Sequence, residues 1–327
     1  MHLIVARAGF LTTVQDTGRT GFREFGVATG GALDLHGMRV ANLLVGNSEA
    51  AAGLEITSGN VRLQFADSRV VAWVGGEYDV SANGLSVPAG RPALLHAREE
   101  LAFAGPARGC RAWLAISGGL DVPVVLASRS GDLRGGFGGW HGRALRDKDV
   151  LPLGEKPAPS SALISSLQRT RIAPWTAPFE WASPVERTPV LRILRGNDWD
   201  RFTDAARRAF LFEKFTVAPE SDRMGARLEG PLLDRKENTE LVSEAVVAGT
   251  VQVPRGGRAI LLLGDCQTIG GYPKLAHVIT CDLPRAAQLC PGEQVRFCEV
   301  SMAEAHLLLS ERTRALETFK IGLSLRL

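Results

Sequence analysis

Short apolar or alternating runs, separated by glycine and proline, recur along most of this chain. They include VRLQF at 61–65, VVAWV at 70–74, ALLHA at 93–97 and RAWLAIS at 111–117. Runs of this length between turn residues are typical of strands in β-sandwiches and β-barrels. Glycine pairs such as Gly118–Gly119 supply the positive φ angles that tight turns between antiparallel strands require. The pattern therefore predicts a mainly β protein.

Three segments carry the start signals of helices. Asp34 precedes LHGMRVANLLV and Thr203 precedes DAARRAFLFEKF. Both residue types are frequent N-caps, because their side-chain oxygens accept a backbone N–H of the first turn. Near the C-terminus, Ser301 and Glu304 form an S-x-x-E capping box. This box predicts a terminal helix over residues 302–319.

The length of the chain, 327 residues, predicts two domains. A proline-rich stretch at 156–189 has the composition of a linker, with Pro157, Pro159, Pro174, Pro178, Pro184 and Pro189. We therefore expect a first β-barrel half over 1–155 and a second over 190–327, which includes the C-terminal helix. The two halves could exchange strands.

A short internal repeat favours two similar halves. Leu95, Glu99, Leu101 and Phe103 recur at the same mutual spacing as Leu289, Glu293, Val295 and Phe297. In each case a turn leads into an alternating strand. Chance similarity between two short strands is the alternative.

Charge and hydropathy exclude several classes of protein. The 38 Lys and Arg and the 35 Asp and Glu are dispersed, so no basic stripe offers itself to nucleic acid. The start MHLIVARAGF lacks the basic region and cleavage site of a signal peptide, and no apolar stretch is long enough to span a bilayer. We expect a cytoplasmic protein without a nucleic-acid or membrane partner.

The cysteines and histidines do not predict a metal site. The five cysteines are odd in number and form no C-x-x-C pair, so we expect reduced thiols. The six histidines are scattered, without an H-E-x-x-H or H-x-H arrangement.

Four segments are richer in glycine and in charged or amide side chains than core strands require. They are 13–19 with 30–34, then 128–136, 221–230 and 264–274. Glycine lets a backbone approach a ligand closely, arginine can hold a carboxylate or phosphate through two hydrogen bonds, and aspartate can orient the arginine or take a proton. The alternative is that these are turns held by local Arg and Asp hydrogen bonds.

Common catalytic and nucleotide motifs are absent from the sequence. It contains no G-x-x-x-x-G-K-[ST] loop and no G-x-S-x-G nucleophile elbow. Gly136-Phe137-Gly138 fails as a dinucleotide fingerprint, because His141 stands where the third glycine should be. A stand-alone hydrolase with a covalent serine is therefore disfavoured.

Taken together and in this order, the four segments resemble the family called allophanate hydrolase subunit 2, also described as biotin-dependent carboxyltransferase-like. Matching stretches include TTVQDTGR at 12–19, SRSGDLRGGFGG at 128–139, SDRMGARLEG at 221–230, VSEAVVAGTVQVP at 242–254 and QTIGGYPK at 267–274. The resemblance implies two cyclophilin-like β-barrel domains with a few short helices.

The chain departs from the family pattern in three places. Gly131 replaces the Thr of S-R-S-T-D, Cys266 replaces the Arg of D-R-Q-T, and the P-x-S-G-A loop reads ATGGA at 28–32. Loss of a guanidinium at position 266 removes one expected anion contact near Gln267.

The resemblance implies, first, a subunit of an ATP-dependent 5-oxoprolinase complex that converts 5-oxoproline to glutamate and is inactive alone. One alternative is the carboxyltransferase component of a biotin-dependent urea or amide carboxylase. Another is a non-catalytic protein that antagonises a kinase inhibitor. The implied partners are a subunit-1-type, KipI-like protein and a LamB/YcsF-like subunit. ATP would act at the level of the complex. Biotin would arrive only on a partner, since the chain lacks an A-M-K-M sequence.

Opening a lactam needs cationic donors for the developing charge and an acid or base for the ring nitrogen. Within the matching stretches we expect catalytic roles for Asp132, Asp222, Arg223 and Glu244. We expect substrate-binding roles for Arg129, Gln267, Tyr272 and Lys274. Arg223 in particular is expected to present its planar donor fork to a carboxylate or phosphate.

Overall fold

The computed structural model describes residues 1–237 and 239–326, which group into two compact units. The first unit comprises Met1–Arg19, Gly30–Val185 and the C-terminal residues from Leu316. The second comprises Thr20–Thr29 and Glu186–Ala315. A short N-terminal segment therefore belongs to the second unit, and the end of the chain belongs to the first.

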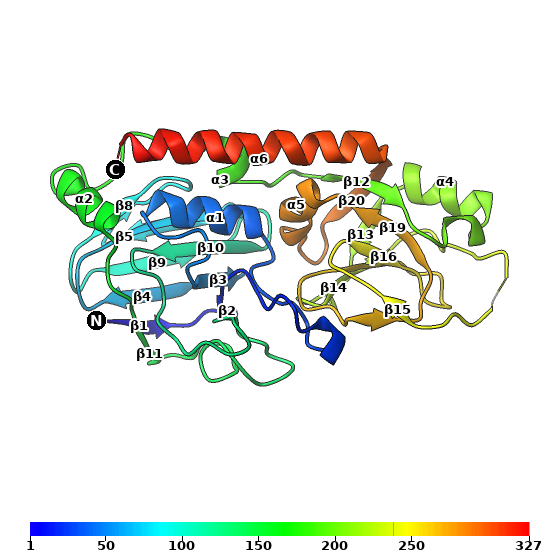
Figure 1. Ribbon diagram of the computed structural model, residues 1–327, viewed down its shortest axis with the longest axis horizontal. Helices are drawn as coiled ribbons and strands as arrows, with labels where there is room; N and C mark the ends of the chain where they lie inside the picture. Colours follow the sequence, from blue (N-terminus) through cyan, green and yellow to red (C-terminus); the bar gives the residue numbers. More distant parts are fainter. Residues whose placement is uncertain (238, 327) are drawn as a thin grey trace. The chain divides into compact units, whose positions relative to one another are not determined.

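The first unit contains two antiparallel sheets that share one apolar core (Figure 1). The strand orders are β11-β1-β4-β9-β6-β7 and β2-β3-β10-β5-β8. The strands are β1 His2–Arg7, β2 Leu11–Gln15, β3 Gly53–Thr57, β4 Val61–Phe65, β5 Arg69–Gly75, β6 Asp79–Ala82, β7 Leu85–Ser86, β8 Ala93–Leu95, β9 Glu100–Ala104, β10 Arg111–Ile116 and β11 Val150–Pro152. Here, where a barrel was expected, the sheets end in short edge strands such as β7.

Burial along these strands explains their sequence patterns. In β4 the apolar side chains of Val61, Leu63 and Phe65 are fully buried and alternate with more exposed Arg62 and Gln64. Strand β5 is buried at every position, because it has the core on one face and helix α1 (Leu35–Leu44) on the other. Alternation thus marks strands with one wet face, and continuous apolar runs mark strands covered on both.

The proline-rich stretch expected as a linker carries two helices, α2 (Ala158–Leu167) and α3 (Phe179–Ala182). Their prolines lie at the helix starts, where the backbone nitrogen has no intrahelical partner to lose. Leu163 and Leu167 of α2 are buried in the same cluster as α1. This stretch therefore packs within the first unit as far as Val185.

The second unit is a closed seven-stranded barrel, in the order β12-β19-β16-β17-β14-β13-β20. Its strands are β12 Val190–Arg195, β13 Phe215–Val217, β14 Gly225–Glu229, β16 Thr250–Gln252, β17 Ile260–Leu262, β19 Lys274–Val278 and β20 Gln294–Glu299. Parallel pairing of β12 with β20 contributes to the closed ring. A separate two-stranded ribbon pairs β15 (Glu244–Ala245) with β18 (Ile269–Gly270).

The other helical elements of the second unit are short. They are α4 (Asp204–Phe212), α5 (Leu283–Ala287) and the 3-10 turns Arg23–Phe25, Trp199–Arg201 and Thr280–Asp282. Helix α4 packs on β20, where Phe210 stacks on Phe297 with ring centroids 4.5 Å apart.

The predicted helices are confirmed, and their caps form as expected. Asp34 Oδ1 accepts a hydrogen bond from Gly37 N at 2.7 Å, and Thr203 Oγ1 accepts one from Ala206 N at 3.1 Å. The terminal helix α6 runs over Met302–Ser324, slightly longer than predicted, and starts at the Ser301 cap. The mainly β fold class with few helices and a C-terminal helix is also confirmed.

The internal repeat forms the same local structure in both units. Glu99 Oε2 accepts a hydrogen bond from His96 N at 2.7 Å, and Glu293 Oε2 accepts one from Cys290 N at 3.1 Å. Each glutamate thus closes the turn before a strand, β9 or β20, whose two repeat residues are buried in the core: Leu101 and Phe103, or Val295 and Phe297. The predicted turn and strand are confirmed in both halves.

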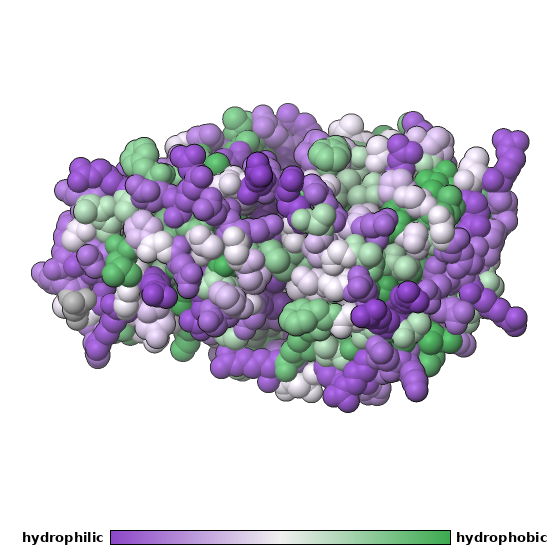
Figure 2. Space-filling model, turned by 180° about the vertical axis from the view of Figure 1, so that it is seen from behind, coloured by the Kyte–Doolittle hydropathy of each residue, from purple (hydrophilic) through white to green (hydrophobic). Residues whose placement is uncertain are grey.

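Hydrophilic residues dominate the face of the molecule shown in Figure 2, and hydrophobic ones form small separate groups on it. Among the described residues, no helix is long and apolar enough to cross a membrane.

Candidate functional site

In the first unit, one carboxylate joins the first two of the four segments. Asp16 Oδ1 accepts hydrogen bonds from Gly18 N at 2.8 Å, Ser128 Oγ at 2.6 Å and Ser130 Oγ at 2.5 Å. Its Oδ2 accepts one from Arg129 N at 2.6 Å. Because Asp16 is only 7% exposed, these charge-assisted bonds replace its hydration. The stretches TTVQDTGR and SRSGD are therefore tied together by a single side chain.

The predicted site residues of this unit make local contacts. The Arg129 guanidinium pairs with Asp121 at 2.7 Å, in a partly exposed ion pair. Asp132 Oδ1 accepts hydrogen bonds from Arg134 N at 3.1 Å and Gly135 N at 2.8 Å. In the structure Asp132 therefore holds its own turn.

The third and fourth segments meet in the second unit through a buried ion pair. Arg223, 5% exposed, donates from Nε to Asp265 Oδ2 at 2.8 Å and from Nη2 to Asp265 Oδ1 at 3.1 Å. The donor fork expected to face a ligand is thus engaged by Asp265. Next to it, Asp222 Oδ1 accepts hydrogen bonds from Met224 N at 2.8 Å and Gly225 N at 3.2 Å. Asp222 holds a turn as Asp132 does.

A buried lysine lies where the ribbon meets the barrel. The Lys274 side chain is 4% exposed, and its Nζ donates to Glu244 Oε2 at 2.9 Å. Glu244 lies on β15 and is 60% exposed. The backbone nitrogen of Lys274 donates to Asp198 Oδ2 at 2.9 Å, which fixes the start of β19.

Two cross-strand pairs face each other at this point. Gln252 pairs with Lys274 in the barrel, and Glu244 pairs with Gly270 in the ribbon. Directly paired residues project from the same face of a sheet. A Cβ added at Gly270 would lie 2.8 Å from Gln252 Nε2, so glycine permits this close approach. The ribbon therefore lies over the Gln252–Lys274 pair.

The remaining predicted residues join the same cluster. Gln267 Nε2 donates to Gln252 Oε1 at 3.3 Å, and Gln252 Nε2 donates to the Tyr272 carbonyl at 3.2 Å. The structure thus brings together Glu244, Gln267, Tyr272 and Lys274, with Gln252 at their centre. We refer to these five residues as the ribbon cluster.

Sequence reasoning missed three polar residues at this site, Gln252, Thr250 and His277. Thr250 Oγ1 lies 3.2 Å from His277 Nδ1 across β16 and β19. Burial, and secondarily the charge of Lys274, lowers the pKa of His277, which favours the neutral imidazole at neutral pH. The signal was the alternation Thr250-Val251-Gln252-Val253, which puts two polar side chains on one face of a strand.

A guanidinium lies beside position 266 although the residue there is cysteine. Arg23 Nη2 donates to the carbonyls of Val246 and Thr268. Burial raises the pKa of the Cys266 thiol, and the charge of Arg23 opposes that shift. Arg23 therefore supplies from another segment the group whose loss the sequence suggested, and it braces both strands of the ribbon near their ends.

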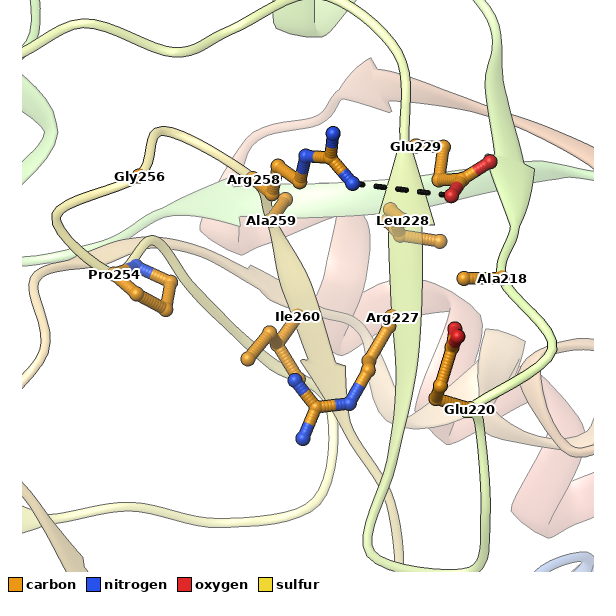
Figure 3. A pocket seen from close by; sticks show the side chains of 10 residues that line it. All are labelled: Ala218, Glu220, Arg227, Leu228, Glu229, Pro254, Gly256, Arg258, Ala259 and Ile260. Atoms are coloured by element: carbon orange, nitrogen blue, oxygen red, sulfur yellow. Dashed lines mark ion pairs between the residues drawn. The ribbon is translucent and has the colours of Figure 1, made fainter.

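Two hollows open on the second unit. One, of about 480 Å³, is lined by Tyr272, Gly271, Leu241 and neighbouring residues, so it adjoins the ribbon cluster. The other, of about 540 Å³, lies on the outer face of β14 and β17 (Figure 3). Figure 3 shows Arg258 and Glu229 facing each other there, 3.8 Å apart. None of the predicted site residues lines this second hollow.

Metal-binding and redox groups are sparse in the part of the chain that the structure describes. No group of three or more His, Cys, Asp or Glu residues is placed to hold a metal ion there. All five cysteines are free thiols.

Comparison with known proteins places this chain in a family. Residues 25–299 match the family described as "Carboxyltransferase domain, subdomain A and B". The chain belongs to this carboxyltransferase domain family. The resemblance drawn from the sequence motifs is thereby confirmed.

Two bacterial relatives, each a subunit of a 5-oxoprolinase, match this carboxyltransferase-domain chain along most of their length. The protein from Escherichia coli (strain K12) is 36% identical over 315 residues, 96% of each chain. The protein of the same name from Haemophilus influenzae is 33% identical over 293 residues, 90% of this chain and 89% of the relative.

A solved structure shows the same carboxyltransferase fold within a larger protein. The Kluyveromyces lactis urea carboxylase matches with a TM-score of 0.88 and 28% identity. The match covers 98% of this chain and 29% of the longer yeast chain.

Proposed function

We propose that this chain is a subunit of an ATP-dependent 5-oxoprolinase complex that converts 5-oxoproline to glutamate. The observation that carries the proposal is the 36% identity to the 5-oxoprolinase subunit of Escherichia coli across 96% of both chains. End-to-end correspondence at this level favours the same role in an assembly. The proposed substrate is a small cyclic amide.

Within that reaction, the ribbon cluster would bind and orient the substrate. The Lys274 ammonium offers positive charge, and the amides of Gln267 and Gln252 offer both donors and acceptors to a lactam. Glu244, which is exposed and next to the ammonium, is placed to exchange a proton with the ring nitrogen as the C–N bond breaks. Tyr272 would line the entrance.

The other predicted residues would act indirectly. Arg223 orients the turn that leads through Asp265 to Gln267. Asp222 and Asp132 hold their turns, and Arg129 is fixed by Asp121 and Asp16. We propose positioning roles for these four residues.

ATP would be bound by a partner protein. An unstrained amide is a poor electrophile, so phosphorylation of its carbonyl oxygen by ATP would let water attack and release the amine. Phosphates often bind at helix N-termini. Here the N-termini of α1, α4 and α6 are already capped by Asp34, Thr203 and Ser301. These three starts therefore do not fit a nucleotide, and we propose that the chain is inactive alone.

The test is reconstitution with a KipI-like subunit-1-type protein and a LamB/YcsF-like protein. Glutamate release from 5-oxoproline should require ATP and all three chains, and omission of any one should abolish it. Turnover by this chain alone, or none by the full set with partner binding intact, would contradict the proposal. Stable partner binding without turnover would favour the regulatory alternative.

A second candidate is carboxyl transfer, favoured by the match to the Kluyveromyces lactis urea carboxylase. The amide pair Gln252–Gln267 offers donors and acceptors that fit the ureido ring of a partner's biotin as well as a lactam. When bound, biotin would supply the carboxyl group. Bicarbonate-dependent carboxylation of urea with a biotinylated partner, and no glutamate from 5-oxoproline, would establish this candidate instead.

A further inference from the structure

The two halves of the Lys274–Glu244 ion pair lie in different environments. The lysine side chain is 4% exposed and that of the glutamate 60%. A buried ammonium requires an anionic partner, because an uncompensated charge away from water is costly. An exposed carboxylate can return to water at little cost. The pair is therefore asymmetric: Lys274 must keep an anion, while Glu244 can leave.

The surroundings favour replacement of Glu244 by another carboxylate. The Asp198 carboxylate near the start of β19 is already engaged by the backbone nitrogen of Lys274 and by Arg201, at 2.9 and 2.8 Å. Glu244 sits on a two-residue strand whose pairing is with β18 alone. A hollow of about 480 Å³ adjoins the cluster at Tyr272.

We propose that Lys274 is the binding point for the carboxylate of a small substrate, and that Glu244 is an internal carboxylate which the substrate displaces. Gln252, 1% exposed and paired with Lys274 across the barrel, then positions the rest of the ligand through Gln267. The identity of that ligand as a carboxylated lactam rests on the proposed function. Displacement would also free Glu244 from Lys274, so that it becomes a stronger base when substrate is bound.

Isothermal titration calorimetry on the full chain tests the proposal with three probes at pH 7. They are 5-oxoproline, 2-pyrrolidinone, which has the lactam without the carboxylate, and glutarate, which has carboxylates without the lactam. Glu244→Gln removes the competing charge and should lower the Kd of both carboxylates at least fivefold. The Kd of 2-pyrrolidinone should not change.

Glu229→Gln is the matched control, because it removes an equally exposed charge from β14, outside the cluster. It should leave all three affinities at their wild-type values. Lys274→Met should abolish the preference for 5-oxoproline over 2-pyrrolidinone. In thermal melts, Glu244→Gln should melt below the wild type, and 5-oxoproline should raise its Tm more than that of the wild type. The melts read the effect without depending on a folded Lys274 variant.

Unchanged or weaker carboxylate binding in Glu244→Gln would overturn the proposal, as would the absence of carboxylate binding to both proteins. Failure of the proposed function gives a different result. In that case glutarate shows the gain in Glu244→Gln while 5-oxoproline does not bind. The anion site then stands, and the lactam substrate falls.

Discussion

Arg223 and Asp265 form a bidentate ion pair that joins the turn before β14 to the turn before β18. Two side-chain hydrogen bonds of 2.8 and 3.1 Å are supported by one from Asp265 N to the Arg223 carbonyl at 3.1 Å. Gln267 of the ribbon cluster follows two residues later. The position of its amide therefore depends on a guanidinium that need not contact the substrate.

Replacing Arg223 by lysine should mainly reduce stability. Lysine cannot reproduce the two-bond fork, so we expect a loss of about 1–2 kcal/mol in the free energy of unfolding. Urea denaturation measures this loss. Arg227→Lys is the control, because Arg227 is exposed on the same hairpin. An Arg223→Lys chain as stable as the control, yet inactive in an intact complex, would show that the fork faces the substrate.

Asp16→Asn should destabilise the first unit. An amide has one acceptor oxygen and places an N–H₂ group where the carboxylate accepts hydrogen bonds from four donors. We expect a loss of about 2–3 kcal/mol, measured by urea denaturation, since hydrogen bonds to buried charges are stronger than neutral ones. Asp121→Asn removes an exposed partner of Arg129 and should cost less than about 1 kcal/mol. Equal effects would refute the special role of Asp16.

Acid should weaken the first unit through Asp149. Two hydrogen bonds from Arg143, at 2.7 and 2.8 Å, are the main cause that lowers the pKa of this carboxyl from 3.8 to about 2. Because the folded pKa is the lower one, the unfolded chain binds the proton first as the pH falls. The contribution is complete above about pH 4 and disappears as the pH falls towards 2.

The measurement is the difference in unfolding free energy between wild type and Asp149→Asn. That difference should be about 2 kcal/mol at pH 7 and should shrink between pH 4 and pH 2. A difference that stays constant over this range would contradict the assignment.

Local chemistry made much of the fold predictable. The caps at Asp34, Thr203 and Ser301 act within three residues of chain, so the sequence contains all that each helix start needs. The repeat that contains Glu99 and Glu293 was visible for the same reason. The proline-rich stretch misled, because the same residue type begins helices and interrupts them.

Long-range register placed the candidate site, and it could not be read from local patterns. Gln252 meets Lys274 only because β16 pairs with β19 across a register shift after Val251. Arg23 reaches the surroundings of Cys266 because a short N-terminal segment belongs to the second unit. Arg223 was expected to be available to a ligand, since nothing near it in the sequence identifies Asp265 as its partner.

The most direct test of the account is the turnover of 5-oxoproline by the reconstituted complex with Lys274→Met in this chain. Methionine keeps the length of the side chain and removes the ammonium. Assembly and Tm are measured on the same preparation, with Arg227→Lys as the control. We predict an assembled, folded complex whose kcat/KM is at least 100-fold lower, as expected from the loss of about 2.7 kcal/mol of interaction with the substrate's charge. Wild-type kcat/KM in an assembled Lys274→Met complex would contradict the account.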